Sequence, residues 1–480
     1  MEQVLRCCGW SDEVRQALCD FIAANGTDAP DYDPNVYTVF DFDNTTAIFD
    51  SADQLMIYQL ERMAFPLSPD ALMKALFGSL DLAGEITLPG GRKCRYDDWY
   101  ADLSAAYRRL YQTYGPFPAC GLSEEAAKTV QKDPFWQEFA TKMRLLYDLI
   151  CENEGEELAY GWITFWFAGM TEQQVYDLAL ASHRYYGRKK TSRELWRSPA
   201  DLPSRLGAVR CSWLSGFGVT EEVRELMLAL RAHGIAVWIC SASFSDIIRA
   251  AVDAFGLHEA VSGVLSMACR TENGIYLPET DRERDFAWIC LPGGAWVRDT
   301  VPQCAATQGM GKVTAIQNVL CKKYGHGPAA GFMDSTGDFL FCTAFRTMQL
   351  ALCFNRADRR LTDGGALIAA LAVYQRDTLG YDLRKAQEAG DILYLLQGRD
   401  ENGLRALLPG RSSLLLDESE PKLFRGAEND LLLNELLRRS MTTAQAILSF
   451  APATPAEDRR NLLGFRYGFL TETPRYRSLP

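Results

Sequence analysis

Apolar and polar residues follow two different periods along this chain, and each period predicts a different kind of element. Short apolar runs that contain β-branched and aromatic residues and stop at polar residues are typical of buried strands. Apolar residues that recur every three or four positions are typical of helices packed on one face. The clearest strand runs are 36–40, 235–240, 329–333 and 350–354. The sequence therefore predicts several short, buried strands.

Helical and strand patterns alternate after about residue 218. Thr220 is a favourable helix cap, the acidic residues Glu221 and Glu222 follow it, and His233 and Gly234 end that helix. Further helices are predicted at 244–255 and 313–320. Strands that alternate with helices predict an α/β fold with a doubly wound parallel sheet, which binds its ligand beyond the carboxyl ends of the strands.

The spacing of the strands divides the chain into regions. About 200 residues separate the first strand run from the second, far more than a simple crossover needs. The predicted regions are a Rossmann-like core at 1–50 and 216–360, a mostly helical cap at 51–215 and a helical C-terminal extension at 361–480. The extension has helical patterning at 428–450 and no chemical motif. The sequence leaves open whether it buttresses the core, covers the cap or mediates homodimerisation.

Composition narrows the classes of partner. A chain of 480 residues that is 48% hydrophobic and 23% charged can bury large cores and should contain two or three domains. Its net charge of −12 argues against a nucleic-acid surface, because phosphate backbones are bound by clustered Lys and Arg. No stretch approaches the roughly 20 apolar residues of a membrane span. We therefore expect neither nucleic acid nor a membrane as a partner.

The 14 cysteines are scattered, and no two have the C-x-x-C spacing. The first 30 residues have no apolar signal-peptide core, so free thiols in a reducing cytoplasm are expected. None of the four histidines has a partner at zinc-site spacing. The segment from Gly309 to Lys312 is not a nucleotide P-loop, because Val313 stands where Ser or Thr is required.

Candidate chemistry collects at the ends of the predicted strands. Asp41 and Asp43 follow the first strand, where the backbone turns and lets the two carboxylates diverge around one substrate atom. One can attack while the other donates a proton. The other motif residues are Ser241, Ala242 and Ser243 after the second strand, Lys312 before a helix, and Asp334 and Asp338 after the third strand.

In this order, the strand-end Asp pair, Ser, Lys and D-x-x-x-D resemble the four motifs of the haloacid dehalogenase (HAD) superfamily, whose members are mostly phosphatases. The resemblance covers about 36–50 and 220–355. Within the family, the chain looks like phosphoserine and phosphorylcholine phosphatases, and segments 44–50 and 161–171 are similar to bacterial phosphorylcholine phosphatases. The resemblance implies a cap inserted after the first motif and Mg²⁺ as cofactor.

The resemblance implies a role for each charged motif residue. Asp41 would be the nucleophile that forms an aspartyl-phosphate. Asp43 would be the general acid that protonates the leaving alcohol and then activates water. Lys312 would offset negative charge shared by the nucleophile and the phosphoryl group. The ligands of Mg²⁺ would be Asp41, Asp334, Asp338 and the main-chain carbonyl of Asp43.

The same resemblance assigns residues to the phosphate. The Ser241 hydroxyl would donate to a phosphoryl oxygen, main-chain N–H groups after Asp41 would help to hold it, and Thr45 is similar to the threonine that steadies this loop. The implied substrate-binding residues are Ser241, Lys312, Thr45, Asn44 and Ala242. Ser243 is predicted instead to begin the next helix, where Ser is a favoured cap.

The cap is rich in aromatic residues, and these have two interpretations. They include Tyr58, Phe65, Trp99, Tyr100, Tyr107, Trp162, Phe165, Trp166 and Phe167. Aromatic rings usually form the core of a helical domain. Alternatively, ring faces could form a cage that attracts a quaternary ammonium group.

The sequence therefore predicts a Mg²⁺-dependent phosphomonoester hydrolase for a small phosphorylated metabolite, with phosphocholine or a similar amino-alcohol phosphate favoured. A phosphomutase or phosphotransferase would use the same residues and differ only in whether water or a second hydroxyl reaches the aspartyl-phosphate. A non-enzymatic phosphometabolite-binding protein is the third alternative, and the presence of every charged motif residue argues against it.

Overall fold

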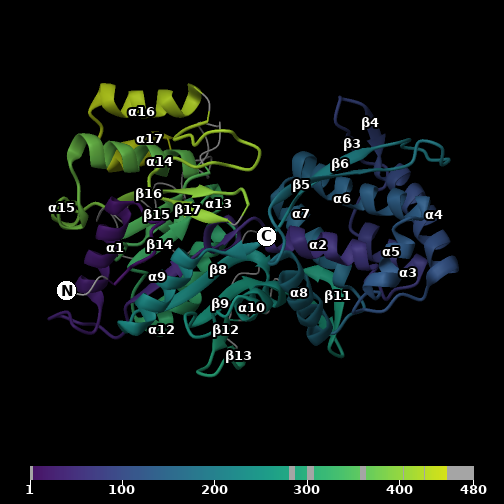
Figure 1. The fold of residues 1–480 in the computed structure, drawn as a ribbon, viewed down its shortest axis with the longest axis horizontal. Helices are drawn as coiled ribbons and strands as arrows, with labels where there is room; N and C mark the ends of the chain where they lie inside the picture. Colours follow the sequence, from purple (N-terminus) through teal and green to yellow (C-terminus); the bar gives the residue numbers. More distant parts are fainter. Residues whose placement is uncertain are drawn as a thin grey trace.

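The structure is a computed structural model that describes residues 4–280, 287–299, 307–356, 364–403, 405–425 and 427–450. Its largest sheet has nine strands in these residues (Figure 1). In spatial order they are β13 (Trp296–Asp299), β12 (Ala287–Cys290), β9 (Gly263–Met267), β8 (Ala236–Phe244), β1 (Tyr37–Phe40), β14 (Ala330–Met333), β15 (Leu350–Phe354), β16 (Leu393–Asp400) and β17 (Ala406–Leu408). Strands β9 to β16 in this order run parallel, and the edge strands pair antiparallel.

Helices cover both faces of the sheet (Figure 1). On one face lie α1 (Asp12–Asn25), α9 (Glu221–Ala232), α10 (Ser245–Ala254) and α15 (Leu383–Glu388). On the other lie α11 (Met310–Ala315), η3 (Ile316–Cys321), α13 (Thr336–Ala344), α14 (Gly364–Tyr374), α16 (Ala427–Arg439) and α17 (Thr443–Phe450). The predicted doubly wound α/β class is therefore confirmed. Among the described residues, no helix has the length and apolar character that crossing a membrane requires.

The central strands are buried on both faces, as their continuous apolar runs predict. Along β1, Tyr37 and Val39 pack on the side of α11 and α14, whereas Phe40 packs on the side of α9. Phe40 stacks on Phe332 of the neighbouring β14, with ring centroids 3.7 Å apart. The predicted cap of α9 is also confirmed, because the Thr220 side chain accepts a hydrogen bond from the main-chain N–H three residues later.

A second, mostly helical body lies beyond the sheet and is inserted after β1 (Figure 1). Its helices are α2 (Ser51–Arg62), α3 (Pro69–Phe77), α4 (Tyr96–Tyr114), α5 (Glu124–Val130), α6 (Pro134–Glu154), α7 (Glu156–Thr164), η2 (Phe165–Phe167) and α8 (Glu172–Tyr186). Three hairpins accompany them, namely β3 (Glu85–Thr87) with β4 (Lys93–Arg95), β5 (Ser192–Arg197) with β6 (Arg210–Ser215), and β10 (Cys269–Glu272) with β11 (Ile275–Thr280).

Where the chain leaves the core and returns, β2 (Ala47–Ile48) and β7 (Gly218–Val219) pair antiparallel, so both connections of the insert meet in one stem. The hairpin β10–β11 comes from a later part of the chain, yet Tyr276 exchanges main-chain hydrogen bonds with Gly169 and Met170 of the insert. The sequence pattern did not indicate that a later segment of the chain would add a hairpin to the insert.

The predicted helical extension at 361–480 also contributes strands to the sheet, which the prediction did not include. Leu393 to Asp400 forms β16, which pairs in parallel with β15, and β17 extends the sheet further. The sequence of β16, LYLLQGRD, has no β-branched residue and becomes polar in its second half, so it lacks the signals that identified the central strands. The helices predicted at 428–450 are present as α16 and α17, and residues 451–480 lie outside the described residues.

His183 joins the insert to the core and makes that junction sensitive to pH. It lies on α8, is fully buried, and its Nε2 donates to the main-chain oxygen of Ile247 on α10 at 3.0 Å. Among the described residues its Nδ1 has no hydrogen-bond partner. Burial lowers the pKa of His183 from 6.5 to about 4.

Because the folded state keeps His183 neutral, the unfolded chain binds a proton first as the pH falls below 6.5, and stability is lost down to about pH 4. We expect His183 to account for a loss of about 2 kcal/mol between pH 7.5 and 5. Denaturant unfolding at both pH values should show a smaller pH-dependent loss for His183→Gln than for the wild type. Equal losses in the two proteins would contradict this assignment.

Candidate active site

The predicted motif residues meet at one edge of the sheet. Asp41 follows β1, Ser241 lies near the end of β8, and Asp334 follows β14, so the carboxyl ends of three adjacent parallel strands supply them. Lys312 lies on α11 and Asp338 on α13, and both side chains point back to this edge. All five residues line one cavity of about 1390 Å³ between the sheet edge and the insert.

Lys312 connects two of the carboxylates. Its ammonium group donates to Asp41 Oδ1 and, at 2.6 Å, to Asp338 Oδ1, and all three side chains are buried. Burial opposes the charge of Lys312, but the charges of Asp338 and Asp41 outweigh it and raise the lysine pKa above its ordinary value. Lys312 is therefore a permanent cation beside Asp41.

Asp41, Asp334 and Asp338 form a cluster of hard oxygen donors. One carboxylate oxygen from each residue lies within 4.8 Å of the other two. Burial, followed by the charges of Asp338 and Asp334, raises the pKa of Asp41, so Lys312 only partly offsets the repulsion. Three close carboxylates that favour added positive charge fit Mg²⁺, which prefers oxygen ligands. The carboxyl of Asp43 lies outside this cluster, and the resemblance assigns only its main-chain carbonyl to the metal.

Asp43 is held separately from the cluster. Its carboxylate accepts hydrogen bonds from the Ser51 main-chain N–H at 2.6 Å and from the Ser243 hydroxyl at 2.5 Å, and the Ser241 hydroxyl lies 3.5 Å away. Burial raises the pKa of Asp43 despite these donors. A raised pKa favours the protonated form that a general acid requires. Asp41, which contacts Lys312, and Asp43, which accepts hydrogen bonds from Ser51 and Ser243, therefore have different polar partners.

The prediction that Ser243 caps the next helix is wrong, because α10 begins after Phe244 and has no side-chain cap. The strand β8 continues to Phe244, so Ser243 stays in extended backbone and its hydroxyl reaches Asp43. Its main-chain N–H also donates to the Ser241 hydroxyl at 3.1 Å. Both serines therefore belong to the surroundings of Asp43.

The remaining predicted substrate residues lie around the loop after β1. Ala242 and Asn44 line the cavity, but the Asn44 N–H donates to the Phe49 main-chain oxygen at 3.1 Å and is engaged there. The Thr45 hydroxyl donates to Asp334 Oδ1 at 3.3 Å, which ties the first motif to the last. The Thr46 hydroxyl donates to the Asp41 main-chain oxygen at 2.6 Å and was not predicted.

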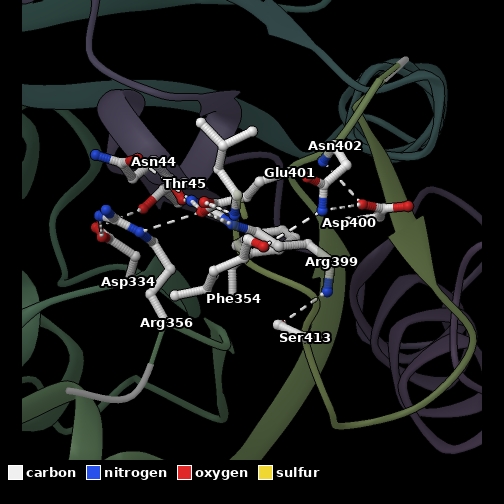
Figure 2. A network of polar contacts seen from close by, with 12 residues as sticks. Asn44, Thr45, Asp334, Phe354, Arg356, Arg399, Asp400, Glu401, Asn402 and Ser413 are labelled. Carbon is white, nitrogen blue, oxygen red and sulfur yellow. Dashed lines mark hydrogen bonds and ion pairs between the residues drawn. The ribbon is translucent and has the colours of Figure 1, made fainter. Parts of the chain in front are cut away.

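Residues that follow β15 and β16 also reach this edge, and the sequence analysis missed them (Figure 2). Arg356 follows β15, and its Nη1 lies 3.1 Å from Asp334 Oδ2. Arg399 and Glu401 lie at the end of β16 and form a buried ion pair. Arg399 donates a hydrogen bond to the main-chain oxygen of Asn44, and Glu401 forms an ion pair with Arg356. The only local signal for Arg356, Arg399 and Glu401 is that each is a charged residue that follows an apolar run. The same signal identified Asp41.

The aromatic residues of the insert largely form its core. Phe65, Trp99, Tyr107, Trp162 and Trp166 are at most 1% exposed and pack together in one apolar cluster. Of the nine aromatic residues considered from the sequence, Phe167 alone lines the described cavity. The nine do not form a cage over the site.

Two other tyrosines and two carboxylates form the wall of the cavity on the insert side. Tyr147 of α6 and Tyr160 of α7 line it together with Asp50 and Glu156. Burial raises the pKa of both tyrosines, and nearby carboxylates that include Asp50 add to the effect, so their hydroxyls stay neutral. This wall combines two aromatic rings with two carboxyl groups, and burial and the charge of Asp43 raise the pKa of Asp50 above its ordinary value.

No protein-family model and no curated protein matches the chain. A solved structure of a "conserved functionally unknown protein" from Anaerococcus prevotii DSM 20548 is 24% identical, covers 88% of this chain and 100% of its own, and has a TM-score of 0.66, so the two share a fold. A solved structure of a protein of unknown function from Bordetella pertussis Tohama I is 12% identical and covers 74% of this chain and 96% of its own, with a TM-score of 0.32. A solved structure of cytosolic 5'-nucleotidase IIIB bound to cytidine is 13% identical and covers 77% of this chain and 84% of its own, with a TM-score of 0.29. At the latter two TM-scores neither structure supports an inference about this chain.

We expect Mg²⁺ to raise the melting temperature of the protein, because a ligand that binds only the folded state stabilises it by about 2.7 kcal/mol at 100 times its dissociation constant. Thermal unfolding with Mg²⁺ and with EDTA measures this shift. Asp334→Asn should remove most of the shift, whereas Asp70→Asn, at an exposed ion pair with Arg108, should keep it. An unchanged shift in Asp334→Asn would place the cation elsewhere.

Proposed function

We propose that this chain is a HAD-type, Mg²⁺-dependent phosphomonoester hydrolase that works through an aspartyl-phosphate on a small phosphorylated metabolite. The observation that carries the proposal is the contact of Lys312 with both Asp41 and Asp338, beside Asp334 and across from a separately held Asp43. A purely structural ion-pair cluster has no need of a separately held second carboxyl that lines the same large cavity.

In the first half-reaction a carboxylate oxygen of Asp41 attacks phosphorus, and the bond from phosphorus to the substrate oxygen breaks. Asp43 gives its proton to the leaving oxygen, so the alcohol departs neutral. Lys312 and the Ser241 hydroxyl stabilise the negative charge on the transferring phosphoryl group. A bound Mg²⁺ supplies positive charge that reduces the repulsion between carboxylate and phosphate.

In the second half-reaction Asp43, now ionised, takes a proton from water while the water oxygen attacks the aspartyl-phosphate. The bond from phosphorus to Asp41 breaks, inorganic phosphate leaves, and both aspartates return to their starting states. Ser51 and Ser243 donate hydrogen bonds to the carboxylate of Asp43 and hold it in place between the two steps. The same geometry serves both steps because the attacking water takes the position of the departed alcohol.

For the substrate we propose an amino-alcohol phosphate such as phosphocholine. The support is the wall of Tyr147, Tyr160, Asp50 and Glu156, which faces the cavity from the insert side. Ring faces and carboxylates both attract a cation, and a quaternary ammonium makes no hydrogen bonds that the wall would have to satisfy. The proposed cation site differs in its residues from the aromatic cage considered from the sequence.

The first experiment is Mg²⁺-dependent phosphate release from a panel that contains phosphocholine, phosphoethanolamine, phosphoserine, sugar phosphates and an aryl phosphate. Asp41→Asn should abolish turnover, because the amide is not a nucleophile. Asp43→Asn should slow turnover by about 10²–10⁴-fold, and less for the aryl phosphate, whose leaving group needs little protonation. Asp28→Asn, at an exposed position, is the matched control.

Full activity in Asp41→Asn would refute the mechanism. Release of alcohol with transfer of phosphate to an added hydroxyl compound, detected by product analysis, would identify a transferase that uses the same residues. Binding without turnover by the wild type would identify a phosphometabolite-binding protein.

The cation site has its own test. Tyr160→Leu should raise KM for phosphocholine by about 5- to 30-fold with little change in kcat, because a desolvated cation–π contact contributes about 1–2 kcal/mol. The neutral isostere 3,3-dimethylbutyl phosphate is the control substrate, and its KM should change much less. Equal increases for the two substrates would show that Tyr160 contributes only to packing.

A further inference from the structure

The C-terminal strand β16 reaches into the active-site loop through Arg399. This side chain is 1% exposed, and its guanidinium group donates to the main-chain oxygen of Asn44 and, at 3.3 Å, to Asn44 Oδ1. Asn44 directly follows Asp43 and has a φ of 61°, a left-handed conformation that residues other than glycine rarely adopt. Arg399 therefore holds the loop at a strained backbone position.

Glu401 connects Arg399 to Asp334 through Arg356 (Figure 2). Its Oε1 accepts from Arg399 Nε at 3.0 Å and lies 3.5 Å from Arg356 Nε, and Arg356 Nη1 lies 3.1 Å from Asp334 Oδ2. The Thr45 hydroxyl donates to the other oxygen of Asp334 at 3.3 Å. These contacts form a closed ring that links the loop after β1, the end of β16 and Asp334.

The ring contains the buried ion pair of Arg399 and Glu401, and Arg356, whose side chain is 30% exposed, lies against that pair. Burial raises the pKa of Glu401, but the charges of Arg399 and Arg356 outweigh it and hold that pKa below its ordinary value. The second oxygen of Glu401 accepts from the Leu416 N–H at 3.2 Å. Apolar residues of similar size often stabilise a protein at least as well as such a buried pair, so stability alone does not explain these charges here.

We propose that Arg399 and Glu401 are positioning residues of the active site. They hold the loop that carries Asp41 and Asp43 at a fixed separation from Asp334, so that the carboxylates can share one divalent cation. The inference rests on the proposed function, because it concerns the metal site of that mechanism. Residues around metal ligands commonly change metal affinity by 10- to 100-fold when they are altered.

The test measures binding of Mn²⁺ by electron paramagnetic resonance in the absence of substrate, because Mn²⁺ accepts the same oxygen ligands as Mg²⁺. Arg399→Lys keeps the charge beside Glu401 but loses the branched contact with Asn44. We expect its dissociation constant for Mn²⁺ to rise by about tenfold or more, with the number of ions bound at saturation unchanged. A merely structural defect would instead lower the number of ions bound.

The matched control is Arg411→Lys. Arg411 comes from the same region and makes ion pairs with Glu13 and Asp377, and it does not contact the loop. We expect its affinity for Mn²⁺ to equal that of the wild type. Glu401→Gln, which keeps the side-chain shape, replaces Arg399→Lys if that variant does not fold, and the same rise is expected.

The outcomes separate the two proposals. If the wild type binds no Mn²⁺ at the site, the metal-dependent function fails, and the positioning role fails with it. If the wild type binds Mn²⁺ and the Arg399 and Glu401 variants bind it equally well, the positioning role alone is overturned. A selective loss of affinity in these variants, absent from Arg411→Lys, supports it.

Discussion

Three carboxylates buried at one end of a sheet repel one another, and the arrangement of this site depends on the cations that offset that repulsion. Lys312 lies between Asp41 and Asp338, and Arg356 lies against Asp334. The offset is partial, because the pKa of Asp41 stays raised. Three close carboxylates whose repulsion is only partly offset could hold a further cation such as Mg²⁺.

The core and the insert contribute different parts of the cavity. The carboxyl ends of β8, β1 and β14 provide the reactive groups, because parallel strands bring their ends to the same edge. The insert provides the opposite wall, where Tyr147 and Tyr160 stand beside Asp50. Both connections of the insert pass through the paired strands β2 and β7, so the wall is carried on a narrow stem. In the proposed function, the core would supply the chemistry and the insert would supply the selectivity.

The C-terminal region is part of this arrangement rather than an appendage to it. It extends the sheet by β16 and β17, and at the end of β16 it places Arg399 against the backbone of Asn44. A strand is a rigid support, so a residue at its end can hold a strained loop more firmly than a residue on another loop could. The same strand brings Glu401 to Arg356, which extends the support to Asp334.

Local patterns in the sequence were enough to predict the α/β fold, the central strands and the candidate residues from Asp41 to Asp338. Strand periodicity and the geometry of parallel sheets bring strand ends together without any knowledge of packing. Local patterns did not predict β16, because its sequence LYLLQGRD contains no β-branched residue and turns polar in its second half. They also did not predict the contact of Arg399 with Asn44, because the two residues are 355 positions apart. The aromatic residues of the insert also could not be placed from local patterns. Composition showed that they are abundant in the insert, but only tertiary packing decided that Trp162 lies in its core and Tyr160 at the cavity, because helix orientation depends on all the neighbouring helices at once.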